Sequence, residues 1–146
     1  IELIRRVGEK YANRVVEKPF WVQVSEKEKV RMVNLELQFA GTEGGTPIII
    51  GSHFDTRPFA DREIELEKKD RPILGANDGG SGTAVLLGLA HFLFQHPVAR
   101  PIHLVFFDGE EAPTPTKTLD PVSCPALLTK YLTITLLSPN RPPFAL

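Results

Sequence analysis

Cysteine is almost missing from this 146-residue sequence, and the single Cys124 cannot form an internal disulfide bond. Cysteine usage therefore does not distinguish an oxidising from a reducing compartment. No run of about 18 unbroken apolar residues is present, so no membrane-spanning helix is predicted. The net charge of −1 gives no reason to expect nucleic acid or an anionic membrane surface as a partner. The sequence also lacks a nucleophile elbow, a Walker loop and a paired-cysteine zinc motif.

The composition is that of a globular protein, with 42% hydrophobic and 24% charged residues. The length suffices for one domain with a real core and is too short for two ordinary ones. The first residue is Ile1, and no signal peptide precedes it, which a processed terminus or a fragment would explain.

The first third of the chain changes its hydrophobic period near Pro19. Residues 1–18 have the spacing of an amphipathic helix, which Pro19 is expected to end. Two runs with alternating apolar residues follow, over 20–25 and 33–39, and predict a β-hairpin around a charged turn. The continuous apolar run at 46–52 predicts a central strand that is covered on both faces.

The middle of the chain alternates a loop, a helix and a strand. Residues 56–76 are polar and predict a long loop. Residues 81–95 are apolar on nearly all sides and predict a buried helix that begins at Ser81, and 102–107 predict another central strand. The order α, β, β, β, α, β indicates an α/β sandwich with helices packed on a mixed sheet.

The last 34 residues differ in character from the rest. Seven of the 13 prolines lie between Pro113 and Leu146, and few residues there are charged. Proline on both sides of the apolar run at 127–137 leaves a strand and a short helix equally unsupported. We therefore divide the chain into a domain over 1–112 and a proline-rich tail over 113–146.

The stretch GSHFDTR places His53 and Asp55 directly after the predicted central strand. In an extended chain, residues two apart point to the same side. Asp55 could therefore hold a ring nitrogen of His53, or both side chains could approach a metal ion. The alternative is a loop histidine beside an acid, without a function.

The stretch GANDGGSG places Asp78 just ahead of the predicted buried helix. The exposed amides and the dipole of a helix start favour an anion at this position. Asp78 could cap the helix or bind a metal ion, and the two roles do not exclude each other.

The stretch FFDGEEA ends an apolar strand in three acids, Asp108, Glu110 and Glu111. Sheet edges of this kind usually carry ligand sites in α/β folds. Adjacent side chains diverge, so one glutamate could bind a metal ion while the other carries a proton. The alternative is a solvated acidic turn.

The remaining histidines, His91, His96 and His103, have no candidate ligand beside them and are interpreted as structural. The three motifs in their order are more specific than each alone. Together they predict an incomplete metal site of histidine and carboxylates, a ligand set that suits zinc.

The stretches HFDTRPFADRE, PILGANDGGSGTAVLLGLAHFL and LVFFDGEEA closely resemble the zinc aminopeptidase and glutaminyl cyclase superfamily. The first and third look most like its bacterial-type glutaminyl-peptide cyclotransferase branch. The resemblance covers about residues 20–112. It implies a three-layer α/β/α sandwich of the zinc-exopeptidase type, with a mixed central sheet and zinc at the carboxyl ends of the strands.

By position, the resemblance implies that Asp78 and Glu111 bind zinc and that Glu110 is the general acid/base. In the two-zinc aminopeptidases, Asp78 would bridge both ions and His53 would bind the second one. In the cyclases, which use one zinc ion, the position of His53 lines the site without binding the metal. In the two-zinc arrangement, Asp55 would lie behind His53.

Asp108 is expected, like Asp55, to lie behind the metal ligands without binding the metal. The family takes a further zinc-binding histidine from later in the domain, whereas no histidine follows His103 here. The tail resembles nothing in the family, so we expect an incomplete front half of the domain, produced by truncation, a frameshift or a misjoined fragment.

The resemblance implies three functions in order of preference. The first is a zinc-dependent glutaminyl-peptide cyclotransferase, an acyltransferase acting on peptide or protein amino termini. The second is a zinc aminopeptidase, a metallopeptidase that hydrolyses amino-terminal residues. The third is an inactive fragment or a non-catalytic module that lacks the last metal ligand. The resemblance alone also suggests a secreted or periplasmic protein.

Overall fold

The computed structural model describes residues 1–25, 27–57, 59–60 and 63–111. The elements run in the order α1 (Glu2–Tyr11), β1 (Arg14–Ser25), β2 (Glu28–Phe39), β3 (Ile48–His53), a 3-10 turn η1 (Leu66–Lys68), α2 (Gly80–Gln95) and β4 (Ile102–Phe107). The predicted tail and Cys124 lie outside the described residues. None of the helices in the described part is long and apolar enough to cross a membrane.

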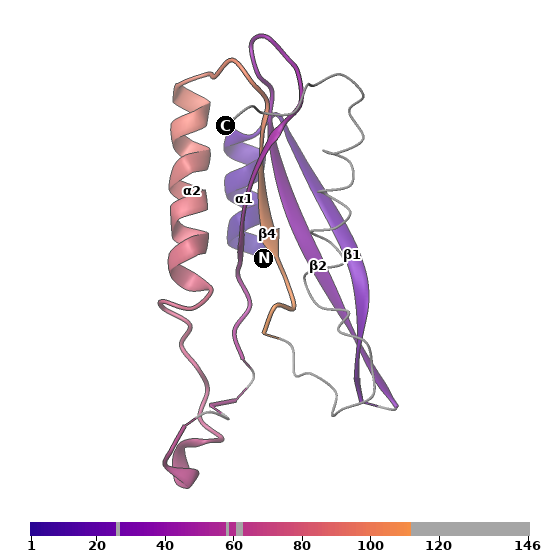
Figure 1. Ribbon diagram of the computed structural model, residues 1–146, viewed down its shortest axis with the longest axis vertical. Coiled ribbons are helices and arrows are strands. Elements are labelled where there is room, and N and C mark those ends of the chain that lie inside the picture. The colour runs from indigo at the N-terminus through magenta and orange to yellow at the C-terminus, as the bar shows by residue number, and fades with distance from the viewer. Residues whose placement is uncertain (26, 58, 61–62, 112–146) are drawn as a thin grey trace, which may run out of the picture.

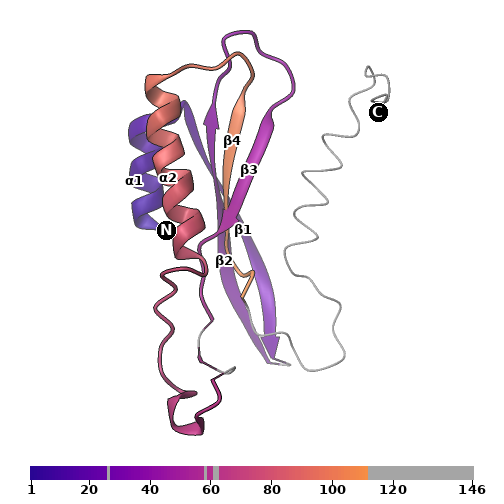
Figure 2. The ribbon, with the colours of Figure 1, turned by 60° about the vertical axis from the view of Figure 1, so that its left-hand side comes forward.

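The four strands form one sheet in the order β1-β2-β4-β3 (Figure 1 and Figure 2). β2 pairs antiparallel with both β1 and β4, whereas β3 and β4 run parallel. The predicted mixed sheet, the hairpin and the central place of β4 are therefore confirmed. The described residues supply this sheet and one layer of helices, because α1 and α2 lie on the same face (Figure 2).

The predicted first helix is too long. α1 ends at Tyr11, and β1 begins at Arg14 and continues through Pro19 to Ser25. The chain turns where the Asn13 side chain accepts a hydrogen bond from the Ala40 N–H at 2.7 Å. β1 pairs only with β2 in the described sheet, and such an edge strand tolerates proline because no ladder bond is lost on its free side.

The core lies between the sheet and the two helices. Leu35, Leu37, Leu104 and Phe106 are fully buried on this face, and α2 packs against them with Leu86, Ala90 and Leu93. The spacing of these α2 residues defines one helical face.

The prediction that α2 is buried on nearly all sides is wrong. Val85 is 68% exposed, Phe92 51% and Phe94 57%, because only one face of the helix contacts the described sheet. The helix also begins one residue before Ser81, with Gly79 as its N-cap.

The prediction that the strand after residue 46 is covered on both faces is also wrong. β3 lies at the edge of the described sheet, and Ile48 is 41% exposed. Its parallel pairing with β4 nevertheless brings the carboxyl ends of both strands to the same edge of the sheet.

Candidate active site

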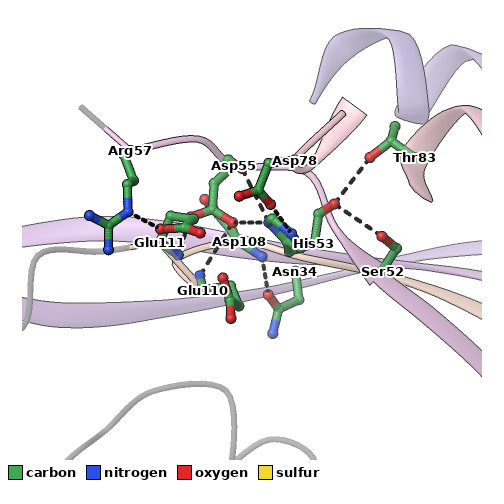
Figure 3. Close-up of polar contacts among 10 residues, drawn as sticks. All are labelled: Asn34, Ser52, His53, Asp55, Arg57, Asp78, Thr83, Asp108, Glu110 and Glu111. Atoms are coloured by element: carbon green, nitrogen blue, oxygen red, sulfur yellow. Dashed lines mark hydrogen bonds and ion pairs between the residues drawn. The ribbon is translucent and has the colours of Figure 1, made fainter. Parts of the chain in front are cut away.

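The candidate site lies where β3, β4 and the start of α2 meet. His53 pairs with Phe107 in the last step of the parallel ladder, and the Phe54 N–H extends the ladder with a 2.9 Å bond to the Phe107 carbonyl. The segments that follow the two strands therefore leave the sheet side by side. Thr83 joins α2 to them, because its hydroxyl donates to the His53 carbonyl at 3.3 Å (Figure 3).

His53 is held from both ring nitrogens. Its Nδ1 lies 3.2 Å from the Asp55 carbonyl oxygen, and its Nε2 lies 3.1 Å from Oδ1 of Asp78. A carbonyl oxygen only accepts, so Nδ1 carries the proton in this contact. In the neutral ring, Nε2 then presents its lone pair to a carboxylate oxygen, and a proton or a metal cation is needed between the two atoms.

Asp78 lies in the glycine-rich turn before α2, and its side chain is 67% exposed. It does not cap the helix, because the N-cap residue is Gly79 and no side chain makes a capping hydrogen bond at this helix start. Gly79 has a φ of 80°, and a Cβ there would come 2.6 Å from the Asp55 carbonyl oxygen. The close approach of this turn to the end of β3 is what sets Asp78 beside His53.

The acidic turn after β4 is fixed to β2 by Asp108. The Asp108 N–H donates to Oδ1 of Asn34 at 2.8 Å, and its Oδ2 accepts the Val33 N–H at 2.9 Å. Burial raises the pKa of Asp108, and the nearby Asp55 carboxylate adds to the shift, whereas the hydrogen bond from Val33 opposes it. Asp108 therefore ties the turn after β4 to β2, and its predicted place behind the metal ligands stays a prediction.

Asp55 holds the other side of the same turn. Its Oδ1 accepts the Glu110 N–H at 3.2 Å and its Oδ2 accepts the Glu111 N–H at 2.8 Å. Its nearest carboxylate contact with the ring of His53, to Nδ1, measures 3.6 Å, which is too long for a hydrogen bond. Asp55 thus supports His53 through its carbonyl and the acidic turn through its carboxylate.

The two glutamates diverge, as the sequence predicts for adjacent residues. Glu110 is exposed, whereas the Glu111 side chain is 15% exposed and its carboxylate accepts a 2.6 Å bond from Nε of Arg57. The sequence reasoning missed Arg57. No pattern in the sequence indicates this contact, because residues 54–57 follow β3 outside any regular strand.

The structure brings all six predicted residues to this one edge of the sheet (Figure 3). Among the residues described, no three His, Cys, Asp or Glu side chains lie close enough together to hold a metal ion. His53 and Asp78 do form a pair that fits zinc: two atoms bound about 2.1 Å from a tetrahedral zinc lie about 3.4 Å apart, against the observed 3.1 Å.

The other predicted structural histidines make contacts that suit that role. Nδ1 of His103 lies 2.8 Å from Oε1 of the buried Glu36, and the ring of His96 stacks on Phe92 with centroids 4.3 Å apart. The ring of His91 lies 5.0 Å from that of Tyr11.

Residues 34–124 match the family described as Peptidase family M28. No curated protein sequence matches the chain. A glutaminyl cyclase from Fimbriiglobus ruber is 32% identical, with a TM-score of 0.67 over 82% of this chain and 38% of its own. A leucine aminopeptidase precursor from Bacteroides thetaiotaomicron is 26% identical, with a TM-score of 0.69 over 82% of this chain and 41% of its own.

A zinc-dependent exopeptidase from Parabacteroides distasonis is 25% identical, with a TM-score of 0.73 over 96% of this chain and 48% of its own. The chain therefore spans less than half the length of these three solved structures. The comparisons confirm the zinc-exopeptidase and glutaminyl cyclase fold and the resemblance to zinc enzymes.

Proposed function

The chain belongs to peptidase family M28, and from this premise we propose that it carries the first zinc ligands and the general base of a glutaminyl-peptide cyclotransferase. Such an enzyme converts an amino-terminal glutamine to pyroglutamate and releases ammonia. One observation carries the proposal: Asp55 fixes the backbone of Glu110 and Glu111 together, so that one carboxylate is exposed beside another that is half-buried. The 32% identity to a glutaminyl cyclase supports this choice of reaction.

Asp78 and Glu111 are the proposed zinc ligands. Both carboxylates come from turns at the same edge of the sheet, and carboxylate oxygens belong to the ordinary zinc ligand set. Zinc, when bound, would supply Lewis-acid polarisation of the side-chain amide carbonyl of the substrate. Catalytic zinc sites use three protein ligands, so a third ligand is required beyond these two.

Glu110 is the proposed proton carrier. It would remove a proton from the α-amino group of the substrate, which then attacks the amide carbon. The same carboxylate would pass the proton to the departing ammonia. This role needs a carboxylate that is accessible and is not bound to the metal, and Glu110 is exposed while Glu111 is engaged by Arg57.

A zinc aminopeptidase is the second candidate, and the contact between His53 and Asp78 favours it. The 3.1 Å separation of Nε2 and Oδ1 suits a metal ion bound by both side chains, which the two-zinc arrangement requires. In that reaction Glu110 would instead take a proton from the water molecule that attacks the first peptide bond.

The test begins with zinc per folded chain, measured by elemental analysis after dialysis. We expect the wild-type chain to bind one zinc ion and Asp78→Asn to bind none. Retention of the ion through dialysis requires a third ligand beyond Asp78 and Glu111. A glutamine-initiated peptide then separates the reactions, because a cyclase releases ammonia and an aminopeptidase releases the first residue. A folded chain that retains no zinc would identify an incomplete site and a non-catalytic module, whereas equal zinc binding by the wild type and Asp78→Asn would contradict the ligand assignment.

A further inference from the structure

Glu111 is held at both of its ends by side chains from the segment that follows β3. Its N–H donates to Oδ2 of Asp55 at 2.8 Å, and its Oε2 accepts from Nε of Arg57 at 2.6 Å (Figure 3). Asp55 and Arg57 both follow the end of β3, and both contact Glu111 in the acidic turn. The position of Glu111 is therefore set from β3 as well as from its own strand.

The contact with Arg57 is not an ordinary surface ion pair. The side chain of Arg57 is 26% exposed and that of Glu111 15%. A charge-assisted bond from a planar guanidinium fixes the direction of a carboxylate, and partial burial reduces the screening by water. Because Arg57 contacts Oε2, the second oxygen, Oε1, can still serve as a metal ligand.

We propose that Arg57 is a positioning residue for Glu111, so that removing its side chain weakens zinc binding. The inference rests on the proposed function. Two effects of Arg57 oppose each other: its positive charge repels a zinc ion, whereas its bond orders the ligand. Partners that order metal ligands typically contribute about 10- to 100-fold in metal affinity, and we expect this ordering effect to exceed the repulsion.

The experiment measures zinc affinity by competition with a chromophoric chelator. We expect Arg57→Gln to bind zinc about 10- to 100-fold more weakly than the wild type. Arg57→Lys should fall between them, because an ammonium group restores the charge but not the planar fork. Arg71→Gln, on the exposed part of the long loop, is the matched control and should stay within about twofold.

A double-mutant cycle tests whether Arg57 acts through Glu111. In the Glu111→Gln background, Arg57→Gln should add less than about threefold, because the group that it orders is already changed. Equal or tighter zinc binding by Arg57→Gln would overturn the proposal, and so would a full effect that persists in the Glu111→Gln background.

Failure of the proposed function gives a different pattern. If Asp78→Asn and Glu111→Gln leave zinc affinity unchanged, the zinc site itself is wrong. The metal-free chain then supplies a second readout: the Arg57 Nε–H resonance should exchange slowly with water and lose this protection in Glu111→Gln. Protection without zinc binding would mean that the pair is structural, which overturns the positioning role, and an unprotected resonance would overturn the contact itself.

Discussion

Nε2 of His53 lies 3.1 Å from Oδ1 of Asp78, so the end of β3 and the turn before α2 converge on one point. Nδ1 of the same ring faces the Asp55 carbonyl at 3.2 Å and must donate to it. The other nitrogen therefore faces a carboxylate oxygen, and this geometry suits a shared proton or a metal cation. A one-zinc and a two-zinc site would differ at this contact, because only the two-zinc site would use His53 as a ligand.

Replacing His53 by Gln distinguishes one zinc ion from two. In the proposed cyclase, His53 only supports Asp78, so we expect the zinc content to stay at one and the affinity to fall about 10- to 100-fold. His91→Gln, on the exposed side of α2, is the control and should change neither quantity. A fall from two zinc ions to one would instead establish the aminopeptidase arrangement.

Replacing Glu110 by Gln removes the proposed proton carrier and keeps the shape of the side chain. We expect turnover of a glutamine-initiated peptide to fall by about two to four decades, the usual size of such a loss. Zinc content should be unchanged, because Glu111 and not Glu110 is the proposed ligand. Glu67→Gln, exposed on η1, should retain the wild-type rate. Loss of zinc from Glu110→Gln would mean that Glu110 is the metal ligand and that Glu111 carries the proton.

The sequence was sufficient to locate the site because its strands are strongly apolar. The runs that became β3 and β4 each end in polar side chains, and parallel neighbours bring such ends to one edge. His53 and Glu110 could be assigned to one site for this reason. Arg57 could not, because its bond to Glu111 depends on the conformation of a loop that no periodic pattern encodes.

The errors in the predicted fold also have a common cause. The helix that was expected to end at Pro19 ends at Tyr11, because pairing of β1 with β2 determines where the strand begins. The exposure of Phe92 likewise depends on which elements lie beside α2, and hydrophobicity alone does not reveal that. Tertiary neighbours determine both the end of α1 and the exposure of α2, whereas the hydrophobic period of the sequence indicates only the local preference for a helix or a strand.

The raised pKa of Asp108 predicts a dependence of stability on pH. A carboxyl whose pKa is raised by folding binds more protons in the folded state, so its contribution to stability is lost as pH rises through the folded pKa. Asp108→Asn cannot ionise, and its amide oxygen can still accept the Val33 N–H. We therefore expect Asp108→Asn to have a higher free energy of unfolding than the wild type at pH 7. At pH 3 this difference should be smaller. Urea unfolding at both pH values measures this, and a larger gain at pH 3 would contradict the sign.

Gly79 and Gly88 allow a matched test of the turn that carries Asp78. An alanine at Gly79 would have to adopt a φ of 80° and would place its Cβ 2.6 Å from the Asp55 carbonyl oxygen. Left-handed backbone and a backbone clash together predict a loss of about 2–4 kcal/mol in the free energy of unfolding.

Gly88 lies inside α2, and a Cβ there would meet nothing within 4 Å. Gly88→Ala should therefore raise the free energy of unfolding, by up to about 1 kcal/mol, through helix propensity alone. Gly79→Ala should also weaken zinc binding, because the Asp55 carbonyl that it displaces is the partner of His53. If both variants changed stability in the same direction, the close approach of this turn to β3 would not be what holds Asp78 in place.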